Sequence, residues 1–208
     1  MDLRLKCGRT LQIVGPSGCG KTLFTVNLLQ NRKHCFNVPL NRVYWFYGSE
    51  EGEIGETAKA IKSLKDVKMI HGFVDGWNKL AKRHDCIVID DLFIESGKEK
   101  DLENLFIRTA RHREIFVIFL TQNLFYKGMR TKNINTHYLV LFKNPRDTLV
   151  IQTLSTQMAI PDRKAMFHDA TYNKPFGYLF FDFTQETPDE LRIRTDIFKS
   201  PMIIYKQQ

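Results

Sequence analysis

Short apolar runs recur along the chain and are separated by longer stretches of mixed polarity. The strongest runs are Thr10–Val14, Val43–Tyr47, Cys86–Ile89, Ile115–Thr121 and Tyr138–Phe142. Apolar runs of this length are typical of parallel strands that are buried on both faces. Because the intervening stretches are long enough for crossover helices, the pattern predicts a β-α-β chain with a mostly parallel sheet.

Two of the intervening stretches carry apolar residues at helical spacing. One contains Phe24, Leu28 and Leu29, and the other contains Leu102, Leu105 and Phe106 after a start signal at Asp101. We expect both stripes to face the core.

The stretch from Gly48 to Gly76 is the least regular part of the chain. It is rich in glycine and lysine and contains one weak strand at Val67–Ile70. A solvated helix face is the simplest interpretation of its lysines.

The last part of the chain predicts a β-hairpin at the edge of the sheet. Two short β-like runs, Gly177–Phe183 and Leu191–Thr195, flank the turn-forming segment Thr187–Glu190. With 208 residues, of which 43% are hydrophobic, the chain is long enough for one α/β domain spanning 1–208. We expect the hairpin to extend this domain at about 176–198.

A complete phosphate-loop motif follows the first predicted strand and precedes the first predicted helix. Its glycines allow the backbone to curl, so that successive N–H groups and the helix N-terminus face the phosphates of a nucleotide. Lys21 would reach the β- and γ-phosphates, and the Thr22 hydroxyl would hold Mg²⁺. The alternative is a glycine-rich turn without a ligand. The motif consists of Gly15, Pro16, Ser17, Gly18, Cys19, Gly20, Lys21 and Thr22.

Two aspartates end the predicted strand that begins at Cys86. Asp90 would bind Mg²⁺ directly or through water, and Asp91 would orient or deprotonate the attacking water. The alternative is a strand capped by two solvated aspartates. Together with the phosphate loop, the pair predicts an ATPase site that uses ATP and Mg²⁺.

A polar amide, Gln122, ends the predicted strand Ile115–Thr121 and could contact the γ-phosphate or the attacking water. In chain order, Val43–Tyr47 lies between the phosphate-loop strand and the acidic strand, and we expect it to be inserted between them in the sheet. The arrangement resembles the additional-strand, catalytic-acid division of P-loop ATPases, which form three-layer α/β sandwiches.

Charge and cysteine content indicate the kind of partner and the cellular location that we expect. The net charge of +8 favours a polyanionic partner such as nucleic acid. The four cysteines form no metal-ligand or CxxC spacing, which favours a reducing, intracellular location. No apolar stretch approaches the roughly 20 residues that span a bilayer, and the first residues do not resemble a signal peptide, so we expect a soluble protein without a membrane partner.

Several segments together resemble the genome-packaging ATPases of the FtsK-HerA superfamily, including the poxvirus-type and Maverick/Polinton-type members. Beyond the phosphate loop and the acidic pair, the similar segments are Arg111–Arg113, Val117–Phe125, Leu141–Asp147 and Gly177–Thr195. The resemblance implies a ring-forming homo-oligomer, a pentamer or hexamer, that hydrolyses ATP to move double-stranded DNA into a preformed capsid. It also implies a capsid or portal partner, and a location in the cytoplasm or nucleus of an infected or element-bearing cell or in the virion. Members commonly place a glutamate where this chain has Asp91.

Three arginines are candidates for an arginine finger that reaches the γ-phosphate of a neighbouring subunit. They are Arg111, Arg113 and Arg146, which flank predicted strands, and a surface position without a catalytic role is the alternative for each.

The segment after Gln122 is a candidate for DNA contact. Its Lys127, Arg130 and Lys132 suit backbone phosphates, and a solvated basic loop is the alternative. Three other functions remain open from the sequence: a superfamily 3-like helicase, an ATP-dependent assembly switch without productive hydrolysis, and a nucleotide kinase.

Overall fold

The structure of the protein is a computed structural model. It describes residues 2–48, 56–74, 76–90, 99–124, 135–145, 149–158, 163–172 and 174–205.

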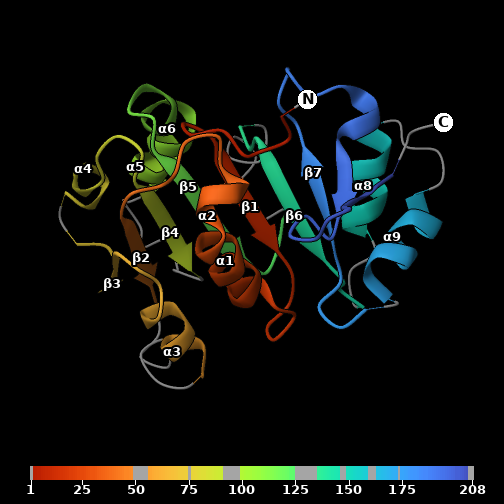
Figure 1. The fold of residues 1–208 in the computed structure, drawn as a ribbon, viewed down its shortest axis with the longest axis horizontal. Coiled ribbons are helices and arrows are strands. Elements are labelled where there is room, and N and C mark those ends of the chain that lie inside the picture. Colours follow the sequence, from red (N-terminus) through yellow and green to blue (C-terminus); the bar gives the residue numbers. More distant parts are fainter. Residues whose placement is uncertain are drawn as a thin grey trace.

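One sheet runs through the whole molecule (Figure 1). Its strands in the described residues stand in the order β3-β2-β4-β5-β1-β6-β7-β8-β9, and neighbours from β3 to β6 are parallel. All five strong apolar runs form strands, as does the weak run at 67–70, so the prediction of a mostly parallel α/β sheet is confirmed. The strands are β1 (Thr10–Val14), β2 (Val43–Tyr47), β3 (Val67–His71), β4 (Cys86–Asp90), β5 (Phe116–Thr121), β6 (Tyr138–Phe142), β7 (Tyr178–Asp182), β8 (Ile193–Thr195) and β9 (Ile203–Ile204).

Helices cover both faces of the sheet (Figure 1). One face carries α1 (Lys21–Gln30), α2 (Arg32–Cys35) and α3 (Glu56–Lys62). The other face carries α4 (Trp77–Leu80), α5 (Glu99–Asn104), the π-helix η2 (Leu105–Thr109), α6 (Ala110–His112), α8 (Leu149–Gln157) and α9 (Arg163–Tyr172). A short 3₁₀ turn, η3 (Asp189–Leu191), lies between β7 and β8. The molecule is therefore a three-layer sandwich.

Successive side chains of the central strands point to opposite faces of the sheet, and this explains why helices cover both faces. In β5, Phe116 and Ile118 pack in the cluster that includes α1, while Val117 and Phe119 pack in the cluster that includes α5 and η2. All four side chains are buried, and full burial of a large apolar side chain contributes about 1.5 to 3 kcal/mol. Because successive side chains of a central strand pack into the cores on opposite faces of the sheet, its sequence is an unbroken apolar run.

The strand inserted between the phosphate-loop strand and the acidic strand is β5. It pairs in parallel with β1 on one side and with β4 on the other. The placement of Val43–Tyr47 at this position was wrong, because β2 pairs with the far side of β4. The additional-strand arrangement is confirmed, with a different strand in the inserted place.

The predicted C-terminal hairpin is confirmed and joins the sheet edge at β6. The strand β7 runs antiparallel to β6, and β8 runs antiparallel to β7. A β9 strand that the sequence did not predict extends the sheet further.

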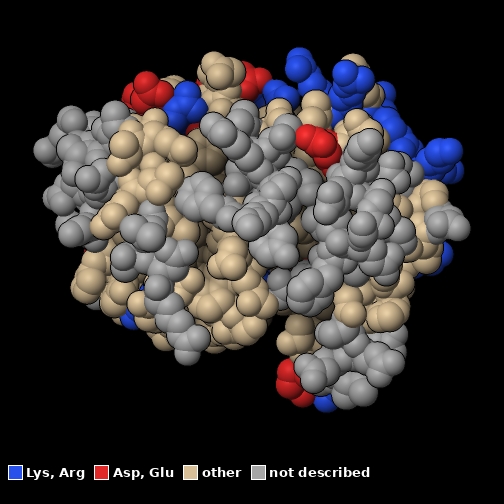
Figure 2. Space-filling view, turned by 180° about the vertical axis from the view of Figure 1, so that it is seen from behind, with Lys and Arg blue, Asp and Glu red and all other residues tan. Residues whose placement is uncertain are grey.

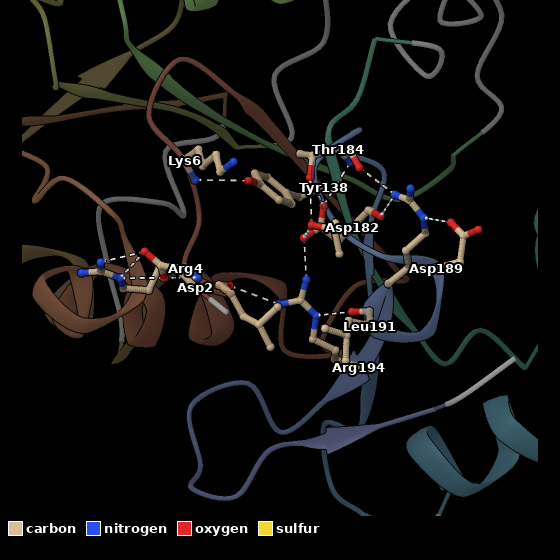
Figure 3. A network of polar contacts seen from close by, with 12 residues as sticks. Asp2, Arg4, Lys6, Tyr138, Asp182, Thr184, Asp189, Leu191 and Arg194 are labelled. Atoms are coloured by element: carbon tan, nitrogen blue, oxygen red, sulfur yellow. Dashed lines mark hydrogen bonds and ion pairs between the residues drawn. The ribbon is translucent and has the colours of Figure 1, made fainter.

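A buried ion pair fixes this hairpin (Figure 3). Arg194 donates from Nη2 to Asp182 Oδ2, from Nε to Leu191 O at 2.8 Å and from Nη1 to Leu3 O at 3.2 Å. The hydroxyls of Thr184 and Thr187 donate to the same carboxylate at 2.6 and 2.9 Å. The network therefore joins β7, β8 and the N-terminal segment.

In the part of the chain that the structure describes, no helix is both long enough and apolar enough to cross a membrane.

Candidate nucleotide site

The phosphate loop connects β1 to the first turn of α1 at the edge where the parallel strands end. Gly18 and Gly20 adopt left-handed φ values of 75° and 108°, which glycine tolerates best. Gly20 occupies the N-cap position of α1, and no side chain caps the first N–H groups of the helix there. Because the first N–H groups of a helix have no partners within it, this end of α1 presents donors and a positive dipole to an anion.

Close packing fixes the start of the loop. A Cβ atom added at Gly15 would lie 2.5 Å from Cys19 Sγ and 2.8 Å from Phe142 Cβ, and the Gly15 N–H donates to Thr121 O at 3.2 Å. Any side chain at this position would displace its neighbours. The loop is therefore tied to both strands that flank β1, to β5 through Thr121 and to β6 through Phe142.

Lys21 lies inside the loop. Its side chain is buried, and its ammonium donates to Gly15 O at 2.8 Å and to Pro16 O at 3.2 Å. These two carbonyls belong to the first turn of the loop, so the cation is held beside the backbone that would surround the phosphates. Thr22 follows in the first turn of α1.

Asp90 ends β4 and lies on the sheet face that carries α1. Its partner there is Trp45 of the neighbouring strand β2, whose indole N–H donates to Asp90 Oδ2 at 3.2 Å. Trp45 is fully buried in the same core cluster as α1. The indole therefore orients one oxygen of the carboxylate.

The sheet register places Asp90 level with the end of β1. Asp90 pairs with Leu120, and Leu120 pairs with Ile13, so two strand spacings, about 10 Å, separate Asp90 from β1. The Thr22 hydroxyl and the Asp90 carboxylate are oxygen donors of the kind that Mg²⁺ prefers, with phosphate oxygens completing its shell. The residues present thus fit a magnesium-nucleotide complex.

Gln122 adjoins the phosphate loop. It lines a small pocket together with Gly15, Asn144 of the segment after β6, and Phe167 of α9. The structure therefore brings Gln122, which directly follows the inserted strand, together with the first residue of the loop.

Five of the predicted site residues lie outside the described residues. They are Asp91, Lys127, Arg130, Lys132 and Arg146. Their assigned roles stay predictions.

Arg111 and Arg113 lie at the opposite edge of the sheet, before β5 begins. The six residues of β5 span about 20 Å, so neither arginine adjoins the phosphate loop of its own subunit. Arg113 donates to Ala81 O and, at 3.5 Å, to Lys79 O, which braces the turn after α4. Arg111 is exposed. In Figure 2, lysine and arginine side chains gather mainly at the upper right of the face shown, and some acidic side chains also lie along the upper edge.

The cysteines are all free thiols. Burial raises the pKa of Cys7 and of Cys35 to about 11, and it raises the pKa of Cys86 further. Thiols with such pKa values are protonated at neutral pH and are weak nucleophiles.

Two residues of this region were not singled out from the sequence. Trp45 was assigned only to a strand, although an indole on a strand next to an acidic strand is a candidate partner for its carboxylate. Phe176 stands between a proline and a glycine just before the hairpin, and its ring packs against Gly20. A turn of this kind is not expected to contribute to the core, so an aromatic residue in it is the sequence feature that could have indicated a functional role.

Comparison with known proteins supports the fold. No protein-family model matches the sequence, and no curated protein matches it. Among solved structures, B204, the DNA-packaging ATPase from Sulfolobus Turreted Icosahedral Virus, is similar with a TM-score of 0.59 and 16% identity over 98% of this chain and 100% of that one. The RadB recombinase matches with a TM-score of 0.43 and 16% identity over 64% of this chain and 74% of that one. The resemblance noted from the sequence is thus confirmed for the fold, which this chain shares with a viral DNA-packaging ATPase.

Proposed function

We propose that the protein is an ATP-driven translocase that packages double-stranded viral DNA into capsids. The observation that carries the proposal is the placement of Gln122, which lines one pocket with Gly15 of the phosphate loop and leads directly into the basic segment 125–132. A side chain in this position can respond to the γ-phosphate and transmit the change to residues that contact DNA. The fold shared with a viral DNA-packaging ATPase supports the proposal.

The chain's own residues supply most of the hydrolytic chemistry. The N–H groups at the start of α1 bind the phosphates, and Lys21 moves from its two carbonyl partners to the β- and γ-oxygens. Thr22 and Asp90 would hold Mg²⁺, which would neutralise charge on the phosphates when bound. Asp91 accepts the proton of the attacking water, and Gln122 orients that water.

The proposed motor is a ring of identical subunits bound to a capsid or portal protein. An arginine of one subunit completes the site of the next, because it stabilises transition-state charge on the transferred phosphoryl group in addition to Lys21 and Mg²⁺. Arg111 is the better of the two described candidates, since it is exposed whereas Arg113 is bound to backbone carbonyls. The net charge of +8 suits a DNA partner. The motor would act in the infected or element-bearing cell and in association with the virion.

A hydrolysis assay with and without double-stranded DNA tests the motor, together with a mass measurement in the presence of nucleotide. We expect DNA to stimulate ATP hydrolysis, nucleotide to promote ring assembly, and Lys21→Ala and Asp91→Asn to abolish the stimulated rate. A monomer whose rate is indifferent to DNA would contradict the proposal and would indicate an assembly switch.

Translocation on intact duplex distinguishes packaging from strand separation. The packaging motor is expected to displace a third strand from a duplex without opening it. Unwinding that requires a single-stranded tail would instead indicate a helicase.

The basic segment after Gln122 is tested by replacing Lys127, Arg130 and Lys132 with alanine. If all three contact phosphates, the plot of log DNA affinity against log salt concentration becomes less steep, its slope shrinking in magnitude by about 2.7. ATP binding should be unchanged. A matched control removes the same charge from three exposed lysines near α3 and β3. These are Lys59, Lys65 and Lys68. Equal losses of DNA affinity in the two variants would show that DNA binding depends only on the net charge of the protein.

A further inference from the structure

We propose that Phe176 is the platform on which the base of the bound nucleoside triphosphate stacks. The inference rests on the proposed function, because it takes the phosphate loop to hold the triphosphate. Phe176 lies in the turn between α9 and β7, and in Figure 1 this turn lies beside the phosphate loop.

The backbone presents Phe176 to solvent in an uncommon conformation. Its φ is +54°, a value that bulky residues rarely adopt, and the residue is 55% exposed. Such conformations persist where the surroundings enforce them, and they gather at ligand sites.

The turn is anchored on both sides of Phe176. Lys174 pairs with Asp196 at 2.7 Å, and the Gly177 N–H donates to Lys174 O at 3.2 Å. A Cβ atom at Gly177 would lie 2.5 Å from Ala170 O, so the glycine is pressed against α9. The exposed ring is thus held in place by the residues before and after it.

The ring of Phe176 packs against the phosphate loop. A Cβ atom added at Gly20 would lie 2.9 Å from Phe176 Cδ1 and 3.2 Å from its Cγ. Gly20 caps α1, whose first turn faces the phosphates, and the exposed apolar side chain of Leu23 lies in that turn. A nucleotide bound through its phosphates must place its sugar and base beside this turn.

The ring of Phe176 is a better platform than that of the nearby Tyr172, which is also exposed, at 43%, but already has two partners. The Tyr172 ring is engaged by the ammonium of Lys143, 3.3 Å from its centroid, and by the stacked ring of His168 at 4.6 Å. Among the described residues, Phe176 forms no aromatic pair. Every nucleobase has a π-face, so the contact adds affinity for purine and pyrimidine nucleotides alike.

The test compares ATP with tripolyphosphate, which has the phosphate chain without base or sugar. In calorimetric titrations we expect Phe176→Ala to weaken ATP binding about tenfold, within the range that removal of a base-stacking aromatic produces. Tripolyphosphate binding should be unchanged, and Phe176→Tyr, which keeps the ring, should bind both ligands like the wild type. Ile203→Ala removes another exposed apolar side chain, on β9, and should change neither affinity.

Two results would overturn the inference. Unchanged ATP affinity in Phe176→Ala would exclude base stacking, and an equal loss of tripolyphosphate affinity would show that the ring only supports the loop. Failure of the proposed function gives a different pattern, in which the wild type binds neither ligand or Lys21→Ala binds both as tightly as the wild type.

Discussion

Replacing Trp45 by phenylalanine removes one hydrogen bond from the carboxylate that we assign to Mg²⁺. The indole N–H donates to Asp90 Oδ2 at 3.2 Å, and a hydrogen bond to a charged group contributes about 1.5 to 3 kcal/mol. Asp90 is partly exposed, so water can replace some of this, whereas Trp45 is fully buried and its truncation leaves a void. We expect the free energy of unfolding to fall by about 2 to 3 kcal/mol.

The same change should loosen the metal site. Groups that hydrogen-bond to metal-binding side chains change metal affinity or activity by about 10- to 100-fold when removed. We therefore expect Trp45→Phe to raise the Mg²⁺ concentration for half-maximal ATP hydrolysis about tenfold, with a smaller change in the rate at saturating Mg²⁺.

Trp77 provides a matched control for this substitution. It is also buried against the sheet, but its indole nitrogen has no hydrogen-bond partner in the described part of the chain. Trp77→Phe should therefore cost only packing and leave the Mg²⁺ requirement unchanged. If both variants shift that requirement equally, or if Trp45→Phe does not shift it, the assigned role of the indole is wrong.

Three further predictions concern the hairpin, pH and the loop. Asp182→Asn and Arg194→Met should each lower the free energy of unfolding, measured by chemical denaturation, by about 3 to 5 kcal/mol. The double variant should lose less than the sum of the two, and additive losses would refute the coupling between the two side chains. Burial lowers the pKa of His137 from 6.5 to about 4, and its Nδ1 accepts from the Thr10 N–H, so the unfolded chain binds the proton first as pH falls. Stability should therefore drop between about pH 6.5 and pH 4, and His137→Asn, which keeps an acceptor, should flatten this drop in urea titrations. Gly15→Ala places a Cβ 2.5 Å from Cys19 Sγ and should cost about 1 to 3 kcal/mol and weaken ATP binding; an unaltered melting curve would contradict this.

The strands β1, β2, β4, β5 and β6 could be predicted because each is an apolar run buried between two helical layers, whereas β9 has only two residues and is not buried. The position of β5 could not, since a parallel crossover can return to either side of the strand that it leaves. Chain order suggested Val43–Tyr47 as the inserted strand, whereas the sheet places Phe116–Thr121 there. Pairing partners of strands are decided by side-chain packing across the whole sheet, which a single sequence does not display.

The phosphate loop and Asp90 could be assigned from sequence because their chemistry is local: a glycine-rich turn and an acid at a strand end. The contacts of Trp45 and Phe176 join segments that are distant in the chain. Each depends on tertiary placement, one on the register between β2 and β4 and the other on a turn next to α1. No pattern within either segment contains that information.

Calorimetric titration of the protein with a non-hydrolysable ATP analogue, with and without Mg²⁺, tests the central claim most directly. We expect one analogue per chain, tighter binding with Mg²⁺, loss of binding in Lys21→Ala, and loss of the Mg²⁺ effect alone in Asp90→Asn. Binding by Lys21→Ala as tight as by the wild type, or a Mg²⁺ effect that survives in Asp90→Asn, would contradict the assigned site.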